Sequence, residues 1–244
     1  YRTLDGMYFD TSKVSDYGKL ARLDIRGLLA GARVAVNPEK KHSTDFAVWK
    51  FSPTDAQRDM EWESPWGKGF PGWHLECSAI SRKYLGDTFD IHTGGIEHRM
   101  LHHPNEMAQS FAVTGKPQAR FWMHNNFINC KEKKMSKSVG TFVRLADLFA
   151  GGVSPLAFRY FVMQTHYRKE IAYSWDAIKA AQRGLANLYK EISFYNNQGD
   201  EQLLDYKQRF FEALADDLNT SKALDIMQRM LGSQNPSSAK FRAL

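Results

Sequence analysis

The spacing of hydrophobic positions changes near residue 72 of the chain. From there, apolar side chains recur every three or four residues, which predicts an α-helix that Gly86 ends. The face that this spacing defines consists of Trp73, Cys77, Ile80 and Tyr84.

A strand, a helix and a second strand follow this first helix. Proline fits only the first turn of a helix, so Pro104 predicts a helix that begins near His102 and ends at Gly115. Helices and strands that alternate in this way predict an α/β domain with a parallel sheet covered by helices. Ligands of such sheets bind beyond the carboxyl ends of the strands, which is where we expect the functional residues. The strands are predicted at residues 88–92 and 121–128, with a loop at Thr93-Gly94-Gly95 after the first.

The two ends of the chain follow other patterns. The first seventy residues are irregular, with short strands predicted at residues 7–9, 34–36 and 45–50 and a loop rich in glycine and proline at 65–72. Beyond Gly140 the pattern predicts an α-helical bundle. Its helices are predicted at residues 145–149, from Pro155 onward, and at 175–194, 205–214 and 221–231.

Composition excludes several classes of protein. Of the 244 residues, 43% are hydrophobic and 25% are charged, which is typical of a globular chain with a buried core. No stretch approaches the ~18 apolar residues that span a bilayer, so we expect no membrane partner. Two cysteines, Cys77 and Cys130, are too few for a disulfide framework, and no signal sequence opens the chain. We therefore expect a cytoplasmic protein, whose net charge of +6 permits an anionic partner such as a nucleotide or RNA.

A lysine-rich segment follows the second predicted strand. Residues 131–140 read Lys-Glu-Lys-Lys-Met-Ser-Lys-Ser-Val-Gly. Such a loop can close on a polyphosphate, because its lysine charges and serine hydroxyls stabilise developing negative charge. The alternative is a solvated basic loop without a function. The string from Lys134 to Ser138 matches the Lys-Met-Ser-Lys-Ser signature of class I aminoacyl-tRNA synthetases, which favours phosphate binding.

Three side chains near the first strand offer metal-ligating atoms. Cys77 lies on the first predicted helix, whereas His102 and Glu106, four residues apart, project from one face of the second. A thiolate, an imidazole and a carboxylate together suit zinc. From spacing alone the alternatives stay open: Cys77 as a small core residue, His102 as part of a helix start and Glu106 as a surface acid.

Four segments together resemble the cysteinyl-tRNA synthetase family. The resemblance covers the chain up to about Leu231 and implies the Rossmann-like, parallel-sheet catalytic domain of a class I synthetase, in its second half, followed by an α-helical bundle. It also implies ATP-dependent activation of L-cysteine and transfer of the cysteinyl group to tRNA(Cys) in protein biosynthesis. The four segments are Ser64 to Ala79, Asp90-Ile91-His92-Thr93-Gly94-Gly95, His102 to Ser110 and the Lys134 loop, and residues 45–50 and 216–220 also match family patterns.

The resemblance assigns roles to the residues around the first strand. It implies one zinc ion per subunit, held by Cys77, His102 and Glu106. Zinc prefers a soft thiolate to a hydroxyl, so such a site would separate cysteine from serine. Trp73 would be an aromatic wall beside the cysteine substrate and His92 a polar contact to it, although the residue pattern alone also fits a core aromatic at position 73.

The lysine-rich segment receives its roles in the same way. The resemblance implies that Lys134 and Lys137 are catalytic and that Lys137 and Ser136 bind ATP, which enters as a substrate with Mg²⁺. The partners that it implies are tRNA(Cys), L-cysteine and ATP, and the subunit is expected to act as a monomer.

The chain also departs from the family pattern. The family's fourth zinc ligand, a cysteine near the amino terminus, and its His-Ile-Gly-His motif have no counterpart here, and the chain opens at Tyr1. We therefore expect a segment of a longer protein, without the carboxyl-terminal anticodon-binding region. Its expected parts are a connective insertion with the approach to the catalytic domain (1–71), the second half of that domain (72–130), a signature-loop and stem-contact region (131–170) and an incomplete helical bundle (171–244).

Two other functions fit the same motifs. A mycothiol-pathway cysteine ligase also makes cysteinyl-adenylate but transfers it to an amino-sugar. A non-catalytic, truncated paralogue would bind zinc or RNA without activating an amino acid. The Lys134 loop argues against the paralogue, because binding alone needs no phosphate clamp.

Overall fold

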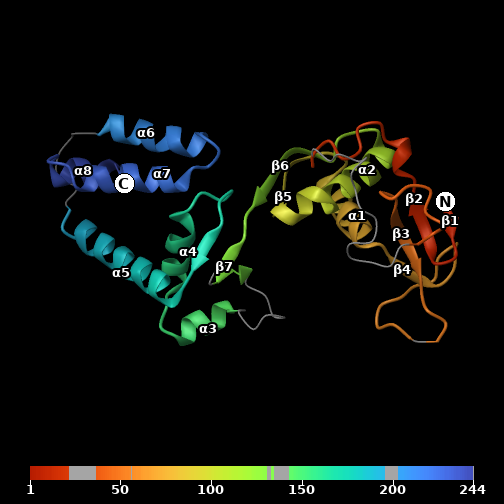
Figure 1. Cartoon of the computed structure of the whole chain (residues 1–244). Coiled ribbons are helices and arrows are strands. Elements are labelled where there is room, and N and C mark those ends of the chain that lie inside the picture. Colours follow the sequence, from red (N-terminus) through yellow and green to blue (C-terminus); the bar gives the residue numbers. More distant parts are fainter. Residues whose placement is uncertain (22–36, 56, 131–132, 135–142, 196–202, 244) are drawn as a thin grey trace. The chain divides into compact units, whose positions relative to one another are not determined.

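The structure is a computed structural model in which two compact units can be recognised. Unit 1 comprises Tyr1–His124 and unit 2 comprises Asn125–Leu244. Figure 1 shows the elements of both, and each unit is described by itself below. The structure describes residues 1–21, 37–55, 57–130, 133–134, 143–195 and 203–243, so the strand predicted at 34–36 lies outside the described residues.

Unit 1 begins with an antiparallel sheet of four strands in the order β1-β2-β3-β4. The loop rich in glycine and proline returns the chain to this sheet, and two of its glycines lie directly against β3. A Cβ atom on Gly69 would lie 2.1 Å from the Lys50 carbonyl oxygen, and one on Gly72 would lie 2.0 Å from that of Ala47. Only glycine permits this approach. The strands are β1 (Arg2–Thr3), β2 (Gly6–Phe9), β3 (Phe46–Phe51) and β4 (Gly69–Pro71), with the short helix η1 (Thr11–Lys13) between β2 and β3.

The second half of unit 1 alternates helices and strands as the sequence predicts. Strands β5 (Phe89–Gly95) and β6 (Ala119–Asn125) pair with one another, and the chain between them forms η3 (Ile96–Met100) and α2 (His102–Thr114). Helix α1 (Trp73–Leu85) precedes β5 and packs against α2. The predicted ends of both helices are confirmed, because Gly86 caps α1 and Gly115, at φ 67°, caps α2.

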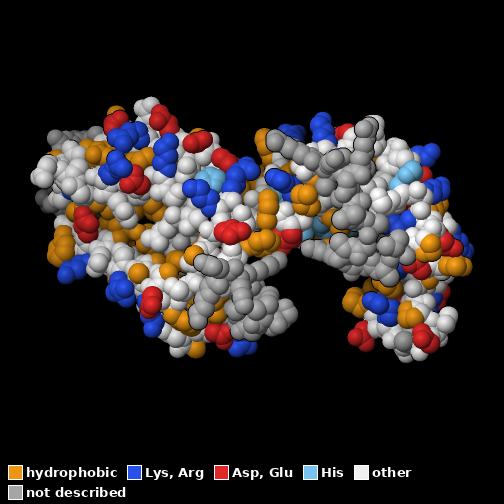
Figure 2. Space-filling model, viewed as in Figure 1, with side chains coloured by type: hydrophobic (Ala, Val, Ile, Leu, Met, Phe, Trp, Pro, Cys, Tyr) orange, Lys and Arg blue, Asp and Glu red, His pale blue; other side chains and the backbone are white. Residues whose placement is uncertain are grey.

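One feature of unit 1 could not be read from the spacing, and two expectations need correction. The hydrophobic face of α1 is exposed, since Trp73, Ile80 and Tyr84 are 55%, 58% and 73% accessible, and the buried residues are His74 and Ser78. Figure 2 shows that hydrophobic side chains reach the surface of the chain. The predicted loop at residues 93–95 is the end of β5. The strand predicted at 121–128 is divided, because β6 ends at Asn125 and a new strand begins at Ile128.

Unit 2 contains a sheet of three short strands in the order β8-β7-β9. β7 (Ile128–Cys130) is antiparallel to β8 (Lys133–Lys134) and parallel to β9 (Ile171–Tyr173). The predicted helices are confirmed. They are α3 (Leu145–Ala150), α4 (Pro155–Met163), α5 (Trp175–Ile192), α6 (Leu204–Ala215) and α7 (Thr220–Leu231), and α8 (Ser237–Ala243) follows them.

The core of unit 2 forms where α4 and α5 pack together. Ala157 of α4 and Ile178 of α5 are fully buried there, and residues of β9 join the same cluster. Side-chain oxygens cap both helices: Ser154 accepts from the Ala157 amide and Ser174 from the Ala177 amide. Within the described residues, no helix is both long and apolar enough to cross a membrane. The architecture is the mixed α/β arrangement that the sequence predicts.

Candidate functional site

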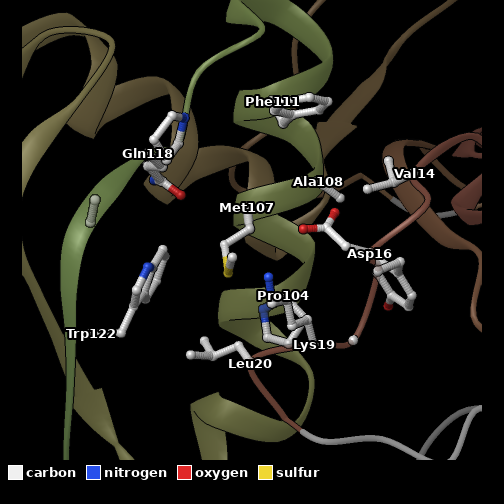
Figure 3. Close-up of a pocket in the computed structure, with 14 residues that line it drawn as sticks. Val14, Asp16, Lys19, Leu20, Pro104, Met107, Ala108, Phe111, Gln118 and Trp122 are labelled. Atoms are coloured by element: carbon white, nitrogen blue, oxygen red, sulfur yellow. The ribbon is translucent and has the colours of Figure 1, made fainter.

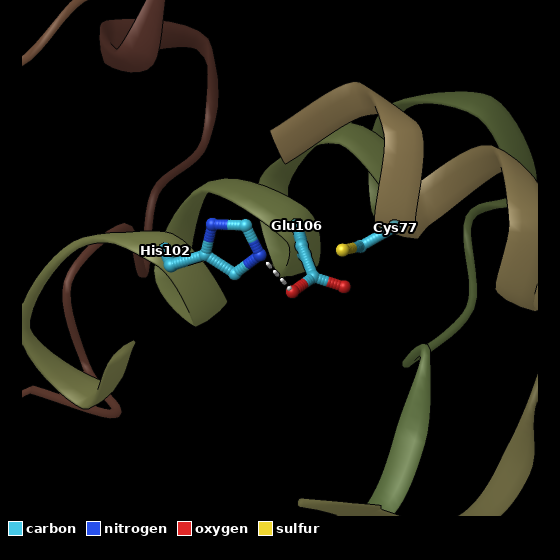
Figure 4. A group of neighbouring side chains, drawn as sticks. All are labelled: Cys77, His102 and Glu106. Atoms are coloured by element: carbon cyan, nitrogen blue, oxygen red, sulfur yellow. Dashed lines mark ion pairs between the residues drawn. The ribbon is translucent and has the colours of Figure 1, made fainter. Parts of the chain in front are cut away.

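The predicted metal ligands lie together in unit 1. His102 opens α2 and Glu106 follows one turn later, so their side chains meet, with His102 Nε2 3.0 Å from Glu106 Oε1. Cys77 reaches them from α1 (Figure 4). One donor atom from each of the three lies within 4.8 Å of the others. We call Cys77, His102 and Glu106 the thiolate triad.

Glu106 carries the negative charge of this site. Its side chain is fully buried, and it accepts hydrogen bonds from Gln118 Nε2 at 3.1 Å and from His92 Nε2 at 3.3 Å. Burial alone would raise the pKa of Glu106, but the hydrogen bonds from His102 and His92 outweigh it and lower the pKa to about 2. The carboxylate is therefore ionised at neutral pH.

A buried histidine orients His102. The Nδ1 atoms of His74 and His102 are 2.8 Å apart, so one donates to the other and the Nε2 atom of His102 faces Glu106. Burial, and then the neighbouring His102, lower the pKa of His74 to about 4, so His74 is neutral at pH 7. A partner on the second ring nitrogen is the arrangement that fixes a metal-ligating imidazole.

The third donor, Cys77, completes a set that fits zinc. Burial, followed by the charges of Glu106 and Glu76, raises the pKa of the Cys77 thiol, so the metal-free thiol is protonated. A bound cation would reverse this, because the thiolate is the ligating form. One sulfur, one nitrogen and one oxygen donor on partly or fully buried side chains suit zinc.

The two residues predicted to contact the amino acid lie beside the thiolate triad. Trp73 is the first residue of α1, and its ring centroid is 4.4 Å from that of His102. His92 comes from β5 and contacts Glu106 directly. The structure therefore brings Trp73 and His92 to the same site, with the indole largely exposed and His92 mostly buried.

The predicted phosphate-binding residues belong to unit 2. Lys134 lies in β8, where its backbone pairs with Asn129 of β7. Ser136 and Lys137 lie outside the described residues. Their proposed roles therefore rest on the sequence motif.

Sequence reasoning missed the histidines that surround the thiolate triad. His74, His103 and His124 are buried, and His98 packs with its ring centroid 5.0 Å from that of His102. The signal was the concentration of histidines between residues 74 and 124, where six of the chain's eight stand.

A separate small cavity borders another part of α2. It measures about 170 Å³ and lies between α2, residues 14–20 and β6. Met107, Phe111 and Trp122 give it a largely apolar lining (Figure 3). Among the described residues that line it there is no predicted site residue, so the candidate site and this cavity are distinct.

The sequence is similar to those of known proteins. The family model of the class I (C) tRNA synthetase catalytic domain matches residues 1–183. Cysteine–tRNA ligase 1 of Burkholderia lata is 50% identical over 97% of the chain and 50% of its own length. The cysteine–tRNA ligase of Novosphingobium aromaticivorans is 42% identical over 95% of the chain and 50% of its own length. The chain thus spans about half the length of these relatives.

A solved structure shares the fold. A ternary complex of LeuRS of Agrobacterium radiobacter K84, with tRNA and LeuAMS, aligns with a TM-score of 0.57 and 13% identity. The alignment covers 75% of this chain and 31% of that one. At this identity the similarity establishes the fold alone.

Proposed function

The chain belongs to the family of class I (C) tRNA synthetase catalytic domains, and on this premise we propose that it carries out the reaction of a cysteine–tRNA ligase. The reaction would activate L-cysteine with ATP and Mg²⁺ and transfer it to tRNA(Cys) in the cytoplasm, with the subunit acting as a monomer. The observation that carries the proposal is the thiolate triad beside the exposed indole of Trp73. The relatives named above are both cysteine–tRNA ligases, which favours this function over the amino-sugar ligase and the non-catalytic paralogue.

The thiolate triad would supply the selectivity for cysteine. Cysteine and serine differ by one atom, and a pocket that measures size alone separates such neighbours by only about 1–3 kcal/mol. Cys77, His102 and Glu106 would hold one zinc ion, whose preference for sulfur over oxygen adds the missing discrimination. Glu106 keeps a negative charge at the site, and His74 fixes the orientation of His102.

The remaining residues would bind and orient the two small substrates. The exposed indole of Trp73 would pack against the amino acid, and His92 would offer a polar contact. Lys134 and Lys137 would stabilise the charge that develops on the ATP phosphates during adenylate formation, and Ser136 would donate a hydrogen bond to them.

Cysteine-dependent ATP–pyrophosphate exchange by the intact protein tests this function. We expect Glu106→Gln to raise the KM for cysteine by about 100-fold, because the variant loses a charged ligand at the cysteine site. Lys137→Ala should lower kcat with little change in this KM, because it acts on the phosphates. His42→Gln, at the surface of unit 1, is the matched control and should behave as the unchanged protein.

Two results would reject the proposal. One is an intact protein that exchanges pyrophosphate with serine as readily as with cysteine. The other is a Glu106→Gln variant that keeps the KM for cysteine unchanged.

A further inference from the structure

A second group of metal-ligating atoms shares Glu106 with the thiolate triad. It consists of His92 from β5 and of His103 and Glu106 from α2, and one donor atom of each lies within 4.8 Å of the others. His92 Nε2 is 3.3 Å from each oxygen of Glu106, and His103 Nε2 is 4.0 Å from Oε1. We call these residues the imidazole triad.

The surroundings hold His103 in an orientation that suits a ligand. Its Nδ1 atom is 2.8 Å from Nε2 of His124, and its ring is 2% exposed. When Nδ1 of His103 carries the proton and donates to His124, the Nε2 atom of His103 is unprotonated. Its lone pair then lies on the side of Glu106. This is the arrangement by which a second hydrogen bond fixes a metal-ligating imidazole.

The end of β5 leaves room for the ring of His103 only because residue 94 is glycine. A Cβ atom there would lie 2.7 Å from Cε1 and 2.8 Å from Nε2 of His103. The backbone of β5 thus lies directly beside the nitrogen that would bind a cation. His92, two residues earlier on the same strand, is placed by the same stretch of backbone.

We propose that the imidazole triad is a second binding site for a divalent cation, in addition to the thiolate triad. Two imidazoles and a carboxylate favour borderline cations such as Co²⁺, Ni²⁺ or Zn²⁺ over hard ones. The two oxygens of the Glu106 carboxylate carry about four lone pairs, so this residue can serve both triads while Oε2 also accepts from Gln118. A cation held here occupies a nitrogen of His92, the residue that the proposed function assigns to cysteine, so cation and amino acid compete for this side chain.

Co²⁺ titration of a variant without the thiolate triad tests this site. The double variant Cys77→Ser, His102→Gln keeps all three ligands of the imidazole triad. We expect it to bind one Co²⁺ per chain, with visible d–d absorbance but without a thiolate-to-cobalt band. Adding His92→Gln should weaken Co²⁺ binding by at least about tenfold.

The control is a histidine that neighbours both triads and belongs to neither. The His98 ring centroid lies 5.0 Å from that of His102 and 5.5 Å from that of His103. His98→Gln in the same double variant should leave Co²⁺ binding unchanged. Absence of Co²⁺ from the double variant, or equal losses with His98→Gln and His92→Gln, overturns the second site.

Circular dichroism checks that each variant is folded. Where the double variant fails to fold, Cys77→Ser alone carries the same comparison of His92→Gln with His98→Gln. None of these measurements uses cysteine or ATP, so the second site and the proposed function can fail independently.

Discussion

The two units of the chain differ in what they bury. Among the described residues, unit 1 buries more polar side chains than hydrophobic ones, with His102, His103 and Glu106 at the centre. In unit 2 the described interior is almost wholly hydrophobic, around Ile178, and Lys240 is its buried polar side chain. An interior of charges and imidazoles stabilises a fold poorly but positions chemical groups well. The described interior of unit 1 therefore suits the positioning of polar groups, and that of unit 2 suits packing.

Mild acid should produce the largest difference in stability between the two units. In unit 1, burial and then the neighbouring His92 lower the pKa of His103 to about 3, and the pKa of His74 is about 4, both below the ordinary histidine value of 6.5. Because the pKa of each of these histidines is lower in the folded chain, the unfolded chain takes up the protons at a higher pH than the folded chain does. The stability of metal-free unit 1 is therefore full above pH 6.5 and is lost as the pH falls toward 4 and then 3. The lowered pKa of Glu106 extends this loss to lower pH.

Amide hydrogen exchange at a series of pH values, after removal of metal, measures this difference. The free energies of opening, corrected for intrinsic exchange rates, should fall in α2 between pH 6.5 and 4 and stay constant in α5. Unit 2 has no buried histidine among its described residues, since His166 is only partly buried. A parallel decline in both helices would contradict the comparison.

A matched pair of isoleucines gives the next largest effect. Ile178→Ala in α5 should lower the free energy of unfolding of unit 2 by about 2–5 kcal/mol, because the side chain is fully buried and its removal leaves a cavity. Ile80→Ala in α1 should change the free energy of unfolding of unit 1 by less than about 0.5 kcal/mol, because that side chain is 58% exposed. Urea unfolding of both variants measures the difference, and equal losses would mean that α1 is covered as α5 is.

The same pair explains how far the sequence could predict this fold. The three-to-four spacing around Ile80 correctly indicated a helix, and Gly86 and Gly115 correctly marked two helix ends. Periodicity cannot say which face is buried when the buried face is polar. In α1 the buried residues are His74 and Ser78, which are satisfied by partners on α2 that are distant in sequence.

The site was predictable to the same extent. His102 and Glu106 are four residues apart, so helix geometry alone places them on one face. The structure accordingly brings together these two candidate ligands that the sequence indicated. The contacts of His103 with His124 and of Glu106 with Gln118 depend on how β6 packs, which no local pattern records. Strand β9 was missed for a similar reason, because its three residues gain their pairing only from β7.

The smallest expected effect comes from the surface charges of unit 2. Asp217 lies between α6 and α7, where it accepts hydrogen bonds from Arg168 and, at 2.6 Å, from the Tyr167 hydroxyl. The bond from Arg168, and then that from Tyr167, lower the pKa of Asp217 to about 2, below the ordinary aspartate value of 3.8. Its stabilising contribution is therefore present above pH 3.8 and is lost as the pH falls toward 2.

Asp217→Asn should therefore shift the urea midpoint of unit 2 only slightly at pH 7, because exposed ion pairs contribute little. The shift should shrink further in 1 M salt, where the Debye length is about 3 Å. The variant should leave the acid transition of α2 above pH 4 unchanged, because that transition belongs to the buried histidines of unit 1. If Asp217→Asn instead moved the α2 transition, surface charge in one unit would control the polar interior of the other, and the contrast drawn between the two interiors would be wrong.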